Sequence, residues 1–144
     1  KPRFVVSANA YAGTSNKPAH PLQRVQIIKG WVNADGHFEQ SVVDVAGDAN
    51  NGAGVDTNTC TAYGEDFAAL CGVWEDSDFN ANQDAVYYAR VIENPSCRWS
   101  TRMCLSFDKE SRPDACENAR IPATIQERAW TAPVWFEASR AGIP

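Results

Sequence analysis

The chain has 144 residues, with 13 Lys and Arg against 18 Asp and Glu, which gives a formal net charge of -5. This length fits one domain with a sizeable core, and a hydrophobic fraction of 44% is too high for a disordered protein. The acidic balance argues against nucleic-acid binding, because phosphate backbones are held by clustered Lys and Arg. The longest apolar stretch, residues 67–74, is too short to cross a bilayer, so we expect no membrane insertion.

The first part of the chain predicts three strands. Residues 3–8 form a short apolar run, and residues 23–32 alternate apolar and polar side chains. The pair Asp35-Gly36 readily takes the positive φ angles of a tight turn. Residues 38–46 then return with three valines, so the two longer segments predict a hairpin in the centre of a sheet.

A loop and a second hairpin are expected next. Residues 47–66 are rich in Gly, Asn, Asp and Thr, and they predict a long loop. Residues 67–74 are the most apolar run and predict a buried strand that places Trp74 in the core. Residues 85–93 are β-branched and aromatic, and we expect them to pair with the preceding strand.

The last third of the chain is irregular. Residues 94–124 hold three prolines, three cysteines and many charges, and a loop of this length needs something to hold it. Thr124 followed by Glu127 fits a capping box, which predicts one helical turn over residues 124–128. Residues 132–136 predict a final strand at a sheet edge, where proline is tolerated.

Strands joined by hairpins predict an all-β fold. We expect an antiparallel β-sandwich, Ig-like or similar, with a long disulfide-stapled C-terminal loop segment, and a small closed barrel is the alternative. Residues 1–144 are expected to form a single domain. The chain begins inside a strand-like sequence without an initiator Met or a leader, which favours a fragment of a longer protein. A mature secreted protein is the other interpretation.

Five cysteines are the unusual feature of the composition. A zinc site needs closely spaced ligand pairs, which this sequence lacks, so disulfides and a periplasmic or secreted location are expected. Cys60 with Cys71 would anchor the long loop to the next strand. Cys104 with Cys116 would close a loop of about a dozen residues, a stabilisation of roughly 3 kcal/mol. Cys97 is then expected to be the unpaired thiol.

Other candidate sites have simpler interpretations. Residues 76–82 alternate oxygen ligands like the start of a calcium loop, but Gly is missing at the sixth position and Tyr87 stands where a bidentate Glu is required. A polar turn explains the same residues. A nucleophilic Cys97 would need a base, and His20 and His37 lie far upstream without a motif. We therefore expect no metal site, cofactor or catalytic residue in this chain.

The aromatic residues leave two functions open. Five tryptophans and four tyrosines can form a carbohydrate-stacking platform, or they can serve as core and interface. Trp99, Trp130 and Trp135 lie in the irregular third, where they can pack against the sheet or against a neighbouring domain. A stand-alone carbohydrate- or peptide-binding module predicts an exposed cluster of Trp. A Cys-dependent enzyme is a third hypothesis, and it requires an exposed Cys97.

Several stretches taken together resemble one known family. They are LQRVQIIKGW at 22–31, VDVAG at 43–47, LCGVWED at 70–76, YYARVIENP at 87–95 with CRWST at 97–101, and IQERAWTAPVW at 125–135. The set resembles the C-terminal part of the bacterial family known as domain of unknown function 3604. Members of that family are several times longer, and they resemble metal-dependent phosphoesterases of the polymerase-and-histidinol-phosphatase type. The metal ligands of those enzymes are His and Asp in an N-terminal catalytic barrel.

The resemblance implies a non-catalytic accessory domain of an exported hydrolase. No metal ligand can be carried over, because the two histidines lie outside any motif. The expected partner is the N-terminal catalytic domain of the same polypeptide, and divalent metal ions would belong to that part. Arg90, Glu93, Arg98 and Trp99 lie beyond a strand end, where a loop can face this partner. A salt-bridged structural turn is the alternative for these residues.

Overall fold

A computed structural model describes residues 1–15 and 19–138 of the chain. The described residues form a mostly β structure with antiparallel sheets, one short α-helix and two disulfides. No helix among them is long and apolar enough to span a membrane. The strands of the two main sheets are β1 (Arg3–Asn9), β2 (Leu22–Val32), β3 (Phe38–Gly47), β6 (Ala69–Glu75), β7 (Ala85–Glu93), β10 (Arg128–Trp130) and β11 (Val134–Phe136).

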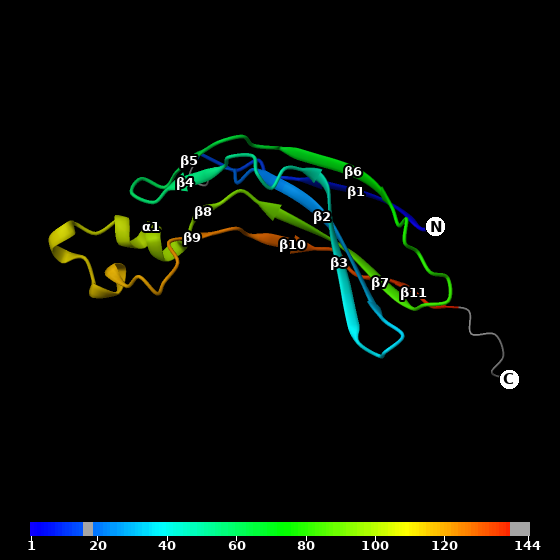
Figure 1. The fold of residues 1–144 in the computed structure, drawn as a ribbon. Helices are drawn as coiled ribbons and strands as arrows, with labels where there is room; N and C mark the ends of the chain where they lie inside the picture. Colours follow the sequence, from blue (N-terminus) through cyan, green and yellow to red (C-terminus); the bar gives the residue numbers. More distant parts are fainter. Residues whose placement is uncertain (16–18, 139–144) are drawn as a thin grey trace.

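Short elements make up the rest of the described chain. They are β4 (Gly54–Asp56), β5 (Thr61–Tyr63), β8 (Ser96–Cys97), β9 (Thr124–Ile125), the helix α1 (Trp99–Leu105), and two 3-10 turns over Lys109–Ser111 and Asp114–Glu117. They lie at one end of an elongated, arched molecule (Figure 1). The long loop predicted for residues 47–66 therefore contains the small hairpin β4–β5.

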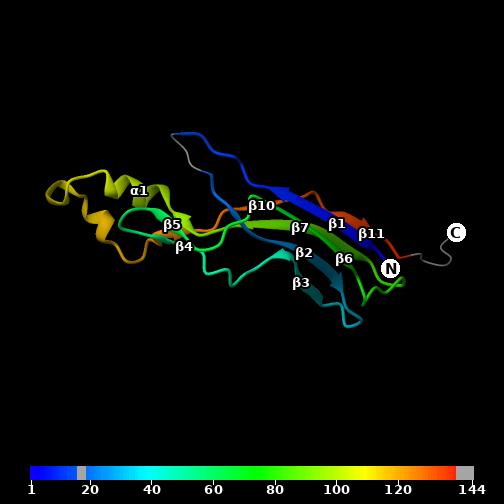
Figure 2. The ribbon, with the colours of Figure 1, turned by 90° about the horizontal axis from the view of Figure 1, so that it is seen from above.

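The large sheet has the strand order β10-β7-β2-β3, and β11 also pairs with β7. The small sheet consists of β1 and β6 and lies over part of the large one, as both ribbon views show (Figures 1 and 2). The predicted hairpin of the second and third strands is confirmed, because β2 and β3 pair from Val32 opposite Phe38 to Arg24 opposite Gly47.

The turn of this hairpin follows from its sequence. The side-chain oxygen of Asn33 accepts hydrogen bonds from the backbone N–H groups of Asp35 at 3.0 Å and His37 at 2.9 Å. Gly36 has a φ angle of +81°, which side chains with a Cβ rarely adopt. Local turn chemistry therefore fixes the register of the two longest strands.

The predicted second hairpin is wrong. The most apolar strand, β6, pairs with β1, whereas β7 lies in the other layer between β2 and the pair β10 and β11. Asp76 lies directly after β6 and is buried, so the chain passes between the layers at this point. Sequence proximity favoured the hairpin, but apolar strands that are neighbours in sequence can also face each other across a core.

The core lies between the two layers. Val25 and Ile27 of β2 and Tyr87 of β7 are buried there. The ring of Phe4 on β1 lies 4.8 Å from the ring of Tyr87 and 6.0 Å from that of Trp74. Trp74, predicted to be in the core, is half-buried at its margin.

Two further expectations concern the C-terminal segment. Residues 124–128 do not form a helical turn, because Thr124 pairs with Cys97 and Arg128 pairs with Ile92 in two short strands. Ladder hydrogen bonds to existing strands replace the bonds that a single helical turn would offer. The predicted last strand is confirmed as β11, which pairs with the outer edge of β7.

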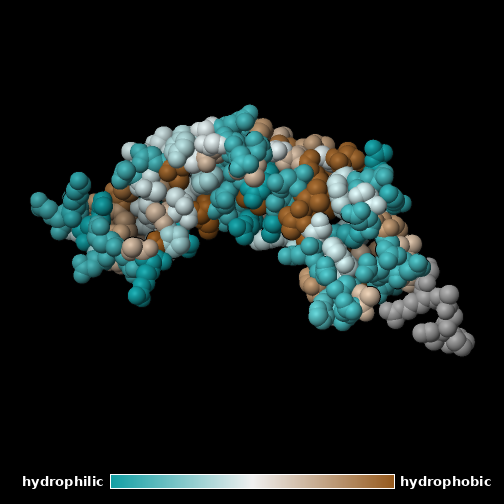
Figure 3. All heavy atoms as spheres, in the orientation of Figure 1, coloured by the Kyte–Doolittle hydropathy of each residue, from teal (hydrophilic) through white to brown (hydrophobic). Residues whose placement is uncertain are grey.

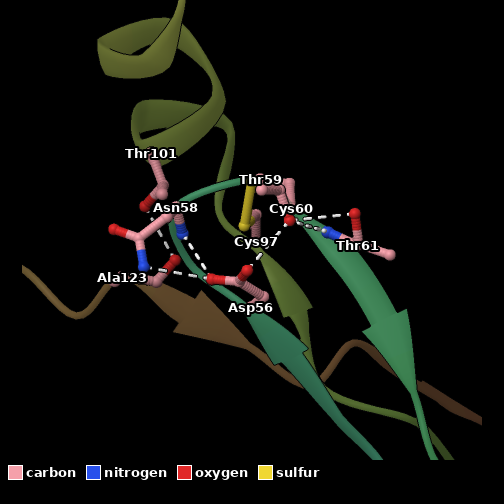
Figure 4. Close-up of a disulfide and its surroundings, with 8 residues drawn as sticks. All are labelled: Asp56, Asn58, Thr59, Cys60, Thr61, Cys97, Thr101 and Ala123. Carbon is pink, nitrogen blue, oxygen red and sulfur yellow. Dashed lines mark hydrogen bonds between the residues drawn. A yellow bond between two sulfur atoms is a disulfide. The ribbon is translucent and has the colours of Figure 1, made fainter.

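The disulfides correct the expected pairing. Cys104 is joined to Cys116, as predicted, but Cys60 is joined to Cys97 and not to Cys71. Cys71 is the free cysteine and is exposed on β6. The turn at the tip of β4–β5 brings Cys60 beside β8 (Figure 4), a contact between segments that are 37 residues apart.

The turn that holds Cys60 is built on Asp56. One carboxylate oxygen accepts hydrogen bonds from the backbone N–H of Asn58 at 2.9 Å and from its side-chain amide at 3.1 Å. The other oxygen accepts from the hydroxyl of Thr59 at 3.1 Å (Figure 4). The hydrogen bond from the Asn58 backbone lowers the pKa of Asp56 below its usual value, and the side-chain bonds act in the same direction.

Candidate interaction surface

One face of the large sheet is covered by β1 and β6, and none of the described strands or helices covers the opposite face. Because side chains alternate along a strand, the register places the residues of this second face in three rows from the β10–β11 edge to β3. The rows are Trp135, Val86, Gly30 and Gln40; then Tyr88, Ile28 and Val42; then Trp130, Arg90, Gln26 and Asp44. These residues, with Val32 and Phe38 at the hairpin end, are called the open face.

The third row is tied together by hydrogen bonds. The guanidinium group of Arg90 donates to Oε1 of Gln26 from Nε at 2.9 Å and from Nη2 at 2.5 Å. The amide nitrogen of Gln26 donates to Oδ1 of Asp44 at 2.6 Å. Arg24 lies 3.5 Å from the same carboxylate. This polar band holds the side chains of three strands in fixed positions beside Trp130.

The exposed apolar residues of the open face lie on its outer strands, whereas Ile28 and Gly30 of the central strand β2 are buried. Trp135 is 71% exposed, Phe38 69%, Trp130 58% and Val42 45%. A side-chain carbon at Gly30 would lie 3.0 Å from the ring of Phe38, so this ring leans over the glycine on the same face. The face lies on the inner curve of the arch in Figure 1, and Figure 3 views it edge-on, with hydrophobic atoms visible near the middle of the molecule.

The four predicted interface residues do not form one cluster. Arg90 belongs to the open face, but Glu93 lies at the end of β7 and close enough to His20 to interact with it electrostatically. Arg98 and Trp99 lie at the start of α1 and line a separate pocket. The other residues of that pocket are His20, Ser96, Cys97, Arg102, Ile125 and Glu127.

Glu93 is in an unfavourable place for a charge. Burial raises the pKa of its carboxyl group, the nearby His20 lowers it, and the carboxylate of Glu127 raises it further. Its backbone is fixed by two contacts, since its N–H donates to the carbonyl of Glu127 and its carbonyl accepts from the Gln126 side chain. Glu93 therefore holds the C-terminal strands, and it does not share a surface with Arg90.

A second polar cluster is buried between the layers. Nζ of Lys29 lies 2.5 Å from Oδ2 of Asp76, and the hydroxyl of Tyr87 donates to the same oxygen at 2.8 Å. Burial raises the pKa of Tyr87, and the hydrogen bond to Asp76 and its negative charge raise it further. The two charges pair with each other, and neither Lys29 nor Asp76 lines a described pocket. We therefore interpret the cluster as a structural link between the two layers.

The signal for this cluster was present in the sequence but was not recognised. Lys29 occupies an inward position of an alternating strand, on the same side as Val25 and Ile27. A lone charge at such a position requires a partner of opposite sign. Asp76, the first residue after β6, supplies it. The open face was missed for another reason, because its rows join residues of five strands.

The described residues contain no metal-binding cluster, and they do not support the predicted Cys97 thiol. Residues 1–15 and 19–138 contain no group of three or more His, Cys, Asp or Glu side chains that could hold a metal ion. Cys97 is buried and disulfide-bonded, so the Cys-dependent enzyme, which required an exposed Cys97 thiol, is contradicted.

Comparison with known proteins places the chain in a family. No curated protein matches it, and no solved structure matches it either. One family of proteins, described as "Protein of unknown function (DUF3604)", matches residues 1–138, which is nearly the whole chain. The chain therefore belongs to the DUF3604 family.

Proposed function

We propose that this chain is a non-catalytic accessory domain that packs through its open face on a metal-dependent, phosphoesterase-like hydrolase domain of the same exported polypeptide. The observation that carries the proposal is the uncovered side of the large sheet. It presents Trp135, Phe38, Trp130 and Val42, each of them substantially exposed. Exposed apolar side chains gathered on one face mark interaction sites, and Trp and Arg are enriched among the residues that dominate binding energy.

The polar band suits the centre of such an interface. Its side chains already satisfy one another, so covering them leaves few unpaired groups. Arg90 uses Nε and Nη2 on Gln26, and the described residues give its Nη1 no partner. We expect the surface of the hydrolase domain to be apolar and to offer one carboxylate or carbonyl oxygen to Arg90.

Matched substitutions test the proposal in the polypeptide that carries both domains. Trp135→Ser removes an indole that is 71% exposed on the open face, and Trp99→Ser removes one that is 70% exposed on α1. Val42→Ser on β3 is matched in the same way by Val73→Ser on β6. We expect the open-face variants to increase hydrogen exchange at the interface and to weaken domain association, and we expect the controls to do neither.

Two results would contradict the proposal. Equal effects of the open-face variants and their controls would mean that the face contacts nothing. Hydrolysis of phosphate monoesters by residues 1–144 alone, with added divalent metal, would mean that the chain is itself catalytic. Both measurements use purified protein, and the second needs no knowledge of the natural substrate.

The arrangement of two tryptophans favours a second candidate function, carbohydrate binding. Trp130 and Trp135 stand opposite Arg90 and Val86 on the same face of the sheet. Four residues along β7 correspond to a separation of about 13 Å. Two indoles with a hydrogen-bonding band beside them can stack on an extended oligosaccharide. A change of tryptophan fluorescence with oligosaccharides that is lost in Trp130→Phe and Trp135→Phe would favour this function over domain packing.

A further inference from the structure

We propose that β1 binds an extended peptide strand of a partner protein, which pairs with its free edge and inserts uncharged side chains into the groove beside it. The groove lies between β1 and the segment from β10 to β11. It is on the covered side of the large sheet, so this inference does not depend on the proposed function, although Tyr88 and Trp130 of the open face also line its pockets.

The backbone of β1 defines a free hydrogen-bonding edge. The carbonyl of Pro2 accepts from the N–H of Asp76, and the N–H of Ala10 donates to the carbonyl of Ala68. Because backbone groups alternate in direction along an antiparallel strand, the even-numbered residues of β1 face β6. The N–H and C=O groups of Arg3, Val5, Ser7 and Asn9 therefore point to the other edge, which pairs with no described strand.

An apolar groove runs along this edge. Two pockets of about 230 and 130 Å³ adjoin each other and share Val6, Ala89 and Thr131. Neither is lined by a charged residue. The floor is made mostly of small side chains, which leave room for side chains from an additional strand. Its small residues are Ala89, Val91, Ala129, Thr131, Ala132 and Val134.

These two features together specify the shape and chemistry of the occupant. A free edge of alternating donors and acceptors is satisfied by an extended backbone, the recognition mode known as β-augmentation. Every second side chain of the added strand, about 7 Å apart, would then point into the groove. The pockets are small and uncharged, so these side chains are of the size of Ala, Val or Thr. A lipid chain or a helix would leave the backbone edge unpaired.

A second copy of the chain does not fit this edge. Pairing β1 with its own symmetry mate would place the two small sheets side by side. The strands β10 and β11 run alongside β1 in the view from above (Figure 2), so those of the two copies would meet beneath the paired edges. The occupant is therefore a separate extended segment of a partner.

Amide hydrogen exchange of the 144-residue chain tests the proposal. The probe is a capped heptapeptide, Lys-Val-Thr-Val-Thr-Val-Lys, with valine at alternate positions. At millimolar peptide, we expect at least about tenfold slower exchange for the amides of Val5, Ser7 and Asn9. The amides of Phe4 and Val6, which face β6, should not change. A peptide N-methylated at the residues that face β1 keeps its side chains but loses these donors, and we expect no binding.

Two variants identify the site. Ser7→Pro removes an N–H that faces the free edge and leaves the ladder to β6 intact, whereas Ser7→Ala keeps the donor. We expect Ser7→Pro to abolish peptide protection and Ser7→Ala to bind as the wild type does. Ala132→Arg places a charge in the groove without touching β1, and it should also abolish binding even if Ser7→Pro fails to fold.

Three outcomes would overturn the proposal. One is the absence of any protection at millimolar peptide. Another is equal binding of the N-methylated peptide, which would mean that side chains alone are recognised. The third is a concentration-dependent dimer, seen by ultracentrifugation, that protects the same amides without peptide, because the occupant would then be a second copy.

Discussion

Lys29 and Asp76 form an ion pair with 2.5 Å between Nζ and Oδ2, and both side chains are less than a tenth exposed. Lys29 also donates to the carbonyl of Asp78 at 3.2 Å, and Tyr87 donates to the Asp76 carboxylate. The group therefore links β2 and β7 of the large sheet to the turn that follows β6. It fixes the position at which the chain passes from one layer to the other.

Removing the lysine charge should be strongly destabilising. Lys29→Met leaves a buried carboxylate without its counter-charge, and we expect the free energy of unfolding to fall by about 3–5 kcal/mol. Urea unfolding measures the change. The double variant Lys29→Met, Asp76→Asn should recover part of the loss, because no unpaired charge remains. If Lys29→Met lowered the free energy of unfolding less than Tyr87→Phe does, the assignment of Lys29 and Asp76 as a buried ion pair would be contradicted.

The disulfide pattern can be tested chemically. Peptide mapping without reduction should find Cys60 joined to Cys97, and native alkylation should label Cys71 alone. The variant Cys60→Ser, Cys97→Ser should lose about 4 kcal/mol, from the loop that the bond closes. Cys71→Ser is the matched control and should leave the free energy of unfolding nearly unchanged. Recovery of a peptide joining Cys60 to Cys71 would refute the pattern.

The raised pKa of Glu93 gives a pH-dependent prediction. The folded protein binds a proton at this carboxyl more tightly than the unfolded chain does. The protonated Glu93 side chain therefore contributes most to stability below the unfolded pKa, and this contribution is lost as the pH rises through the folded pKa. Glu93→Gln should therefore raise the Tm near pH 7, and the gain should shrink as the pH falls through the raised folded pKa and be smallest below about 4. Thermal melts across this range provide the test. If the gain in Tm from Glu93→Gln grew as the pH was lowered, the pKa of Glu93 would not be raised in the folded protein.

Gly72 is required where β6 lies close against β3. A side-chain carbon at this position would lie 2.4 Å from the carbonyl oxygen of Val45 on β3. We expect Gly72→Ala to push β6 away from β3 and to lower the free energy of unfolding by about 1–3 kcal/mol. Val73→Ala, at the next and outward-facing position of β6, is the control. Equal stability of the two variants would mean that the layers are not in contact at Gly72.

Several parts of this protein follow from local sequence alone. The turn around Asn33 and Gly36 fixes its own hairpin, because the side-chain hydrogen bonds and the positive φ angle are both local. The strand predicted at residues 132–136 was recognised by its composition and by a proline that an edge tolerates. The Cys104 to Cys116 bond spans 12 residues of one segment and was predicted from that proximity.

Apart from the β2–β3 hairpin, only the tertiary structure decided which strands are partners. The pairing of β6 with β1, and of β7 with β2 and β10, depends on backbone hydrogen bonds between segments far apart in sequence. Cys60 meets Cys97 because β4–β5 folds beside β8, which no spacing indicates. The open face and the edge of β1 are likewise properties of the assembled sheets. Alternating polarity determines that a strand has two sides, but long-range packing determines which side remains uncovered.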